Sequence, residues 1–222
     1  MKLRTNLKEM TIRVVILLIG LTIAHLGVTL FLLADLGADP FNVFIQGLFR
    51  KINPDSTGFI THGVVHMAIC FLIIIILLFA DRSYVKIGTI LCMFCGGPII
   101  DFFTLILGPL FEGGLPLWLR ILVNGLGCVI LAYGMTIVIK SDAGTGPNDL
   151  VAIVISDKAK KKFSIVRVIV DLCFAGIGFA MGGTVGIGTL ICAFVVGPVA
   201  GIFMPFNERL VNRVIRKTCG GM

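Results

Sequence analysis

Two short stretches decide how this chain folds: Ala34-Asp-Leu-Gly-Ala-Asp-Pro-Phe-Asn-Val43 and Lys140-Ser-Asp-Ala-Gly-Thr-Gly-Pro-Asn-Asp-Leu150. Each follows an apolar run of membrane length, and each joins a Gly to a Pro across two residues before a second apolar run begins. A shift of 107 residues superposes them and pairs identical residues, which are Asp35 with Asp142, Gly37 with Gly144, and Pro40 with Pro147. We call them the first and the second Gly/Pro joint.

The composition around the joints indicates an integral membrane protein. Of the 222 residues, 57% are hydrophobic and only 14% are charged, and the mean hydropathy is +1.05. A soluble domain needs a larger polar share to cover its surface. The first apolar run, about residues 14–33, is long enough to span a bilayer and lacks a small-residue cleavage pattern, so we expect a retained helix rather than a signal peptide.

The apolar runs and the basic residues together predict a topology. A helix needs about 20 apolar residues to cross the hydrocarbon core, and six runs qualify: roughly residues 13–34, 61–80, 86–109, 119–140, 164–182 and 187–206. With six spans, the Lys and Arg residues gather on one side of the membrane, and the other side has only Arg50, Lys51 and Arg120. The positive-inside rule then places both termini in the cytoplasm and explains the net charge of +7 without nucleic acid.

The joints belong to a longer internal repeat. At the shift of 107, further identical pairs are Arg13 with Arg120, Gly20 with Gly127, and Gly27 with Gly134. At a shift of 100, residues 87–98 match residues 187–198 at seven of twelve positions. Each copy has three spans, so the second copy enters the membrane from the opposite side. Such inverted repeats are common in secondary transporters, whose sites lie between the repeats near the midplane, although some channels and membrane enzymes also have them.

The Gly/Pro joints are the first candidate site. A Gly-x-x-Pro segment cannot continue a helix, whereas Pro suits the first turn of a new one, so we predict short helices at about 40–49 and 147–156. Their positive N-terminal ends would attract an anionic group; the alternative is a pair of surface turns. The residues expected to contact a solute are Gly37, Asp39, Asn42, Gly144, Thr145, Gly146, Asn148 and Asp149.

Ionisable side chains at membrane depth form the second candidate site, because they are costly there and usually functional. Arg167 and Asp171 are four residues apart in the fifth span and share a helix face, as do His62 and His66 in the second. We expect His66, Asp101 and Asp171 to couple protons or ions, and Arg167 to pair with Asp171 or with an anionic solute. The alternative is a structural ion pair with hydrogen-bonded histidines.

Other activities lack a signal in this sequence. It has no Gly-x-x-x-x-Gly-Lys-Ser/Thr nucleotide loop and no His-Glu-x-x-His metal motif. No nucleophile–base pair and no set of metal ligands appears either. We therefore expect no enzyme, no cofactor, no bound metal, and no ATP-driven pump on this one chain.

Three motifs resemble a known group of proteins. Leu36-Gly-Ala-Asp-Pro-Phe41, Gly144-Thr-Gly-Pro-Asn-Asp149 and Gly186-Ile-Gly-Thr189 resemble the signature of the YczE/YyaS/YitT group of bacterial membrane proteins, and the YczE type most. The resemblance covers nearly the whole chain and implies an integral protein of the bacterial plasma membrane, of largely undefined biochemistry. In the first joint Asp39 stands where the second has Gly146, so the two joints can differ in function.

These observations predict an all-α polytopic membrane protein with six transmembrane helices in two inverted three-helix repeats. Residues 1–222 form a single membrane domain, with repeat 1 at about 13–112, repeat 2 at about 119–206 and a basic cytoplasmic tail at 207–222. The preferred function is secondary transport of a small solute by alternating access. The positive helix ends at the joints make an anionic solute one candidate. The alternatives are a substrate-binding membrane subunit that works with a separate ATPase, and an accessory protein that does not transport. The expected partners are the lipid bilayer and the solute, with a homodimer or a partner subunit left open.

Overall fold

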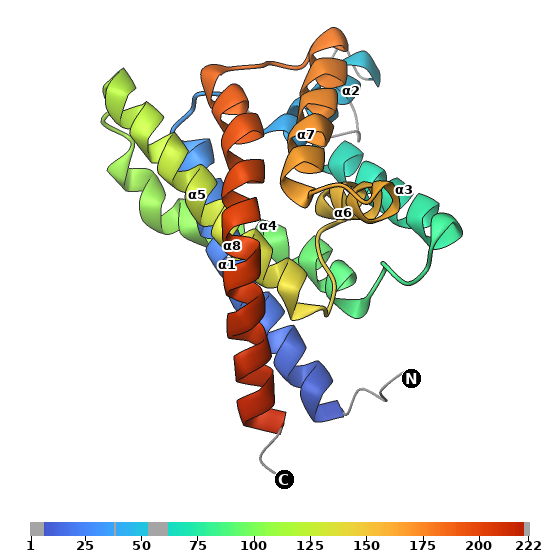
Figure 1. Cartoon of the computed structure of the whole chain (residues 1–222). Helices are drawn as coiled ribbons and strands as arrows, with labels where there is room; N and C mark the ends of the chain where they lie inside the picture. The colour runs from blue at the N-terminus through green and yellow to red at the C-terminus, as the bar shows by residue number, and fades with distance from the viewer. Residues whose placement is uncertain (1–6, 38, 53–61, 220–222) are drawn as a thin grey trace.

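The computed structural model describes residues 7–37, 39–52 and 62–219, and these ranges form α-helices without a β-strand. The helices are α1 (Leu7–Leu33), α2 (Pro40–Ile52), α3 (His62–Ala80), α4 (Ile87–Leu107), α5 (Leu117–Ser141), α6 (Pro147–Ala159), α7 (Phe163–Ala180) and α8 (Ile187–Cys219), with a 3-10 turn, η1 (Gly108–Leu110), after α4. The all-α prediction is confirmed. Both short helices expected after the joints are present, as α2 and α6 (Figure 1).

Five helical segments are long and apolar enough to cross a membrane. They are Leu7–Leu33, Ile87–Leu110, Leu117–Ser141, Phe163–Ala180 and Ile187–Thr218. Large apolar side chains such as Phe94, Leu105 and Trp118 are exposed on their surfaces, as expected where a protein faces lipid. The remaining predicted span, 61–80, corresponds to α3, whose apolar stretch is the shorter Val65–Phe79. The multi-pass prediction is therefore confirmed for five spans, and the sixth stays a prediction.

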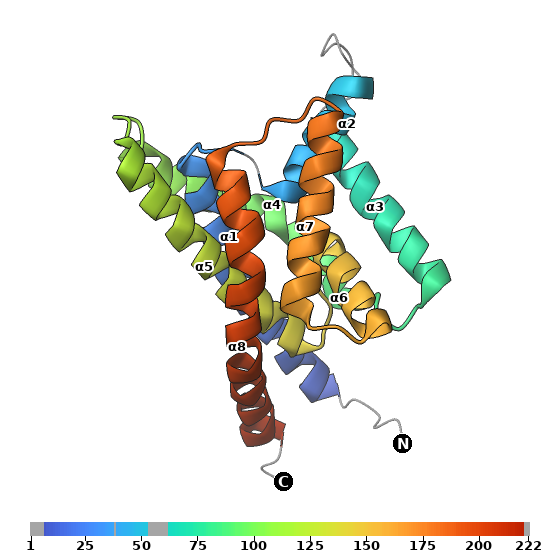
Figure 2. The same ribbon diagram turned by 45° about the horizontal axis from the view of Figure 1, so that its top comes forward.

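The last helix is longer than the span predicted to end near residue 206. It continues to Cys219, because Val211 and Ile215 recur at helical spacing and pack against Ile16 of α1 and Ile137 of α5. The basic residues of the predicted tail are therefore carried on a helix. This helix ends at the same end of the molecule at which α1 begins (Figures 1 and 2).

An antiparallel contact between α1 and α5 forms the centre of the molecule. It is made through glycines, which are Gly20, Gly27, Gly127 and Gly134. A Cβ added at Gly27 would lie 2.4 Å from the backbone nitrogen of Leu131, and one added at Gly134 would lie 2.3 Å from that of Ala24. Because any side chain here would collide with the opposite backbone, these glycines determine how closely the two helices approach.

Each of these two helices also carries an arginine near its start that reaches the end of the other. Arg13 of α1 donates to the Ser141 carbonyl over 2.9 Å, and Arg120 of α5 donates to the Ala34 carbonyl over 2.7 Å. The last carbonyls of a helix lack intrahelical partners and carry partial negative charge, so each guanidinium group satisfies them. The same contact occurs twice, between residues that the sequence repeat pairs.

The remaining helices pack around α1 and α5, but one half is closed more tightly than the other. α4 lies against α1, and α8 against α5; α2 packs along α7, and α7 along α8. The sequence repeat pairs α2 with α6 and α7 with α3. The contact of α6 with α3 is much less extensive than that of α2 with α7. Along the described residues α3 also makes no extensive contact with α4, and Figure 2 shows it at the edge of the molecule.

The glycine contact can be tested with a single methyl group. We expect Gly134→Ala to lower the free energy of unfolding by about 1–3 kcal/mol, because the added Cβ overpacks a backbone contact. The matched control is Gly125→Ala on the same helix, where a Cβ meets nothing within 4 Å. Thermal unfolding of both purified variants in detergent measures the difference; equal midpoints would contradict the close approach of α1 and α5.

Candidate functional site

Each Gly/Pro joint contains a glycine with a positive φ angle, at which the chain turns. Each joint then packs against the first turn of a long helix. Gly37 and Gly144 have φ values of +123° and +139°, a conformation that residues with a side chain rarely adopt. One backbone hydrogen bond of 2.8 Å holds each joint: the N–H of Gly88 donates to Ala143, and the N–H of Gly188 donates to Leu36. The first joint therefore lies on the start of α8, and the second on the start of α4.

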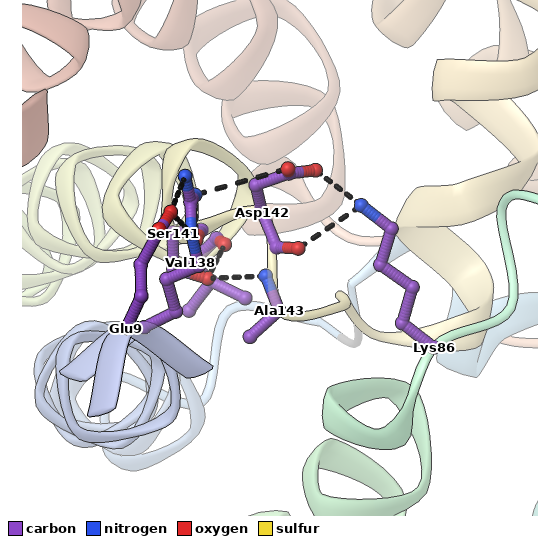
Figure 3. Close-up of polar contacts among 7 residues, drawn as sticks. Glu9, Lys86, Val138, Ser141, Asp142 and Ala143 are labelled. Atoms are coloured by element: carbon purple, nitrogen blue, oxygen red, sulfur yellow. Dashed lines mark hydrogen bonds and ion pairs between the residues drawn. The ribbon is translucent and has the colours of Figure 1, made fainter. Parts of the chain in front are cut away.

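Two cations hold the second joint, as Figure 3 shows. The Lys86 ammonium donates to the Asp142 carbonyl over 3.0 Å and also pairs with the Asp142 carboxylate. Arg13, which pairs with Glu9, lies 3.7 Å from the other carboxylate oxygen of Asp142. These groups anchor the joint where α5 ends.

The two short helices begin differently. Asp39 caps α2: its Oδ1 accepts hydrogen bonds from the backbone N–H groups of Phe41 and Asn42, each of 3.1 Å, and its Oδ2 accepts one of 2.5 Å from the Asn42 side chain. At α6 the N-cap is Gly146, and Asp149 lies in the first turn. Both positive helix ends thus already have a carboxylate of this chain beside them, which leaves less attraction for an anionic solute.

A buried ion cluster joins α6 to α7. The Nε of Arg167 donates to Asp171 over 2.9 Å, and its Nη1 donates to Asp149 over 2.5 Å. The side chains of Arg167 and Asp171 are 9% and 2% exposed, and that of Asp149 is 17% exposed. When all three groups are ionised, the cluster carries one excess negative charge. Such an excess is costly away from water unless a proton or a cation neutralises it.

Residues of the first joint also meet α7 near this cluster. The ring of Phe41 on α2 contacts the ring of Phe174 on α7 edge-on, with centroids 5.2 Å apart, one turn beyond Asp171. Asp39 is within electrostatic range of Asp171. His66 of α3 lies edge-on to Phe41 as well, with centroids 5.5 Å apart. Predicted site residues from both joints and from the second and fifth predicted spans therefore gather around one stretch of α7.

Two of the ionisable residues predicted at membrane depth remain outside this description. The side chains of Asp101 on α4 and His62 on α3 lie outside the described residues, so their roles stay predictions. Asn148, expected to contact a solute, lies at the first turn of α6. Its Oδ1 is 3.0 Å from the position that a Cβ would take at Gly146.

A cavity of about 310 Å³ opens beside the second joint. Its polar lining consists of Ser83, Tyr84, Lys86, Asp142, Thr145 and Asp157, and Gly144 also borders it. Thr145 is 3% exposed, and its hydroxyl has no hydrogen-bond partner among the described residues, which is unusual for a buried polar atom. Leu150 lines the cavity whereas the adjacent Asp149 faces Arg167, so the first turn of α6 separates the cavity from the ion cluster.

The predicted site contains Gly144 and Thr145 of this lining but misses Tyr84, Lys86 and Asp157. Tyr84 and Lys86 belong to the short charged loop at residues 81–86, between α3 and α4. No spacing in the sequence links it to the second joint. Only the packing of α4 and α6 brings these side chains together.

A second buried polar group lies at the first joint. Asn124 on α5 is fully buried, and neither atom of its amide has a hydrogen-bond partner among the described residues. At the shift of 107 its counterpart is Leu17, which lies over Gly88 as Asn124 lies over Gly188. The amide places hydrogen-bonding capacity at the first joint where the other half has an apolar side chain.

Comparison with known proteins places this chain among uncharacterised membrane proteins. Residues 11–205 match the "Family of unknown function (DUF6198)". The "Uncharacterized membrane protein YczE" of Bacillus subtilis (strain 168) is 29% identical over 95% of this chain and 94% of that protein. The "Uncharacterized protein YyaS" of the same organism is 28% identical over 86% of this chain and 92% of that protein. An "Uncharacterized protein" of Haemophilus influenzae is 26% identical over 88% of this chain and 84% of that protein. No solved structure matches significantly.

The ion cluster yields a stability prediction. We expect Arg167→Gln to lower the free energy of unfolding by about 3–5 kcal/mol, because it leaves two carboxylates without their buried counter-charge. Adding Asp171→Asn should restore part of this loss, a coupling that a double-mutant cycle measures by thermal unfolding. The exposed Arg216→Gln on α8 serves as the control. If Arg167→Gln unfolds like the control, the cluster contributes nothing to stability.

Proposed function

The chain belongs to the family of unknown function DUF6198, which confirms its YczE-type resemblance, and we propose that it is a secondary transporter of a small solute. The observation that carries the proposal is the buried cluster of Asp149, Arg167 and Asp171. It lies on α7, where helices that follow both Gly/Pro joints meet. Ionised groups at membrane depth are costly and typically mark solute or ion pathways.

We infer that the frame of the transporter is an inverted repeat of six spans. In this arrangement α1, α3 and α4 correspond to α5, α7 and α8, and α2 corresponds to α6. The paired contacts of Arg13 with Ser141 and of Arg120 with Ala34 support it, as do the paired backbone bonds at the two joints. With the start of α1 and the end of α8 on one side, the distribution of basic residues favours the cytoplasm for that side of a plasma membrane.

The unequal closure of the two halves supports alternating access. α2, α7 and α8 pack closely, whereas α6, α3 and α4 at the corresponding places leave the cavity beside the second joint. We interpret this as a state open to the cytoplasm. An exchange of the two packings would close this cavity and open one beside the first joint, where the buried amide of Asn124 lies. Such exchange around a central site is how inverted-repeat transporters operate.

The cluster offers a way to couple the exchange to ions. Arg167 and Asp171 are four residues apart on one helix, so their pair survives a movement of α7, whereas the Arg167–Asp149 pair joins two helices. Protonation of Asp149 would remove the excess negative charge and weaken the ion pair that joins α6 to α7. His66 and Asp101 remain candidates for the proton path.

Uptake into liposomes that contain only the purified protein tests the proposal. The vesicles are incubated in a metabolite extract with and without an imposed proton gradient, and solutes inside are identified by mass spectrometry. We expect gradient-driven uptake of at least one solute. Asp171→Asn should reduce it by about tenfold or more, because the coupling carboxylate is lost.

The matched control is Asp81→Asn, a carboxylate in the exposed α3–α4 loop. Undiminished uptake by Asp171→Asn would remove the coupling role. Absence of uptake for every solute would contradict the transporter. Uptake that appears only with a copurified ATPase would instead identify a membrane subunit of a larger system.

A further inference from the structure

We propose that the solute is a small organic cation, such as a protonated amine, and that the cavity beside the second joint binds it. This inference rests on the proposed transport function for its biological meaning. The binding site itself is argued from the charges, the hydroxyl group and the size of the cavity. The proposed cation replaces the anionic solute that the sequence predicted.

The charges along the route favour a cation over an anion. Two successive layers each hold two carboxylates and one cation: Asp142, Asp157 and Lys86 in the cavity lining, then Asp149, Asp171 and Arg167 in the buried cluster. Arg13 also approaches Asp142, but it is paired with Glu9 and adds no net charge. The lysines at 158–162 are exposed and do not line the cavity.

An anion on this route would add to an excess of negative charge, whereas a cation would reduce that excess, and the effect is strongest beside the buried cluster, where the dielectric constant is lower than at the exposed cavity. The helix N-termini do not change this balance. Asp39 occupies the N-terminus of α2, and Asp149 lies in the first turn of α6. The positive end that would otherwise favour an anion therefore already faces a carboxylate in each case.

The uncharged groups of the cavity also suit an amine. Thr145 borders the cavity, and its buried hydroxyl, which has no hydrogen-bond partner among the described residues, would accept an N–H from a solute that displaces the atoms covering it. The Tyr84 hydroxyl donates to Asp157 over 3.1 Å and so holds that carboxylate in the lining. An ammonium group can additionally contact the face of the tyrosine ring. Carboxylate, hydroxyl and aromatic ring together are the groups that recognise amines.

The size and the walls of the cavity limit the rest of the solute. About 310 Å³ is at the lower end of small-molecule sites, which span roughly 300–1,000 Å³. Ile139, Leu150 and Ile153 form its apolar wall. We therefore expect one charged amine on a short apolar body, no larger than a single ring with a side chain.

Binding to the purified full-length protein in detergent tests the inference without a gradient. The probes are a series of amines from methylamine to benzylamine, with carboxylates of matched size from acetate to benzoate, at neutral pH in a calorimeter. We expect saturable binding of the larger amines and none of the carboxylates. Asp157→Asn should weaken amine binding by about tenfold, the contribution of one charged hydrogen bond, and Thr145→Val should weaken it less.

Asp81→Asn is the matched control, because that exposed carboxylate lies in the α3–α4 loop that carries Tyr84 but not in the lining; it should leave the affinity unchanged. Binding of carboxylates but not amines, binding of neither, or equal affinities for Asp157→Asn and the control would overturn the inference. Carboxylate uptake into liposomes would do so as well, while leaving the transporter intact. Amine binding without uptake of any solute would instead contradict transport and leave the cation site standing.

Discussion

The close approach of α1 and α5 is the constraint on which the remaining structure depends. Glycines on both helices let the two backbones touch, which is an effective way to hold helices together in lipid, where the hydrophobic effect does not drive association. The antiparallel contact brings the start of each helix to the end of the other. Arg13 and Arg120 can therefore satisfy the last carbonyls of the opposite helix, and both joints emerge from defined positions.

The two Gly/Pro joints make matching backbone contacts, but the side chains around them differ. Asp39 caps α2 where Gly146 precedes α6, and Asn124 lies over Gly188 where Leu17 lies over Gly88. Differences of this kind allow similar backbones to pack to different extents in the two halves. The tighter half contains α2, α7 and α8, and the looser half contains the cavity. Matching joints with different side chains are compatible with the proposed exchange between two packing arrangements. They are also compatible with a solute path that favours one sign of charge.

The charges inside the molecule are arranged around one helix. Arg167 and Asp171 belong to α7 itself, whereas Asp149 reaches them from α6. Such a cluster contributes little to net stability compared with apolar packing of the same volume. Its position between the two short helices is therefore the basis of the proposed binding and coupling roles, and its excess of carboxylate favours the positively charged occupant that we propose.

Hydropathy and local spacing in the sequence determined the all-α class, the positions of the long helices, the two Gly/Pro joints and the short helices α2 and α6. These are local consequences of apolar length and of Gly and Pro chemistry. The sequence also contained a signal for the cap of α2, since Asp directly before Pro is a typical helix start, although Asp39 was interpreted only as a solute contact.

Only the tertiary structure decided that Arg167 binds Asp149 of α6, and that Tyr84, Lys86 and Asp157 border one cavity with Thr145. The partners in these contacts come from different helices and loops. No periodicity relates them, because which faces meet depends on how closely the glycines let α1 and α5 pack.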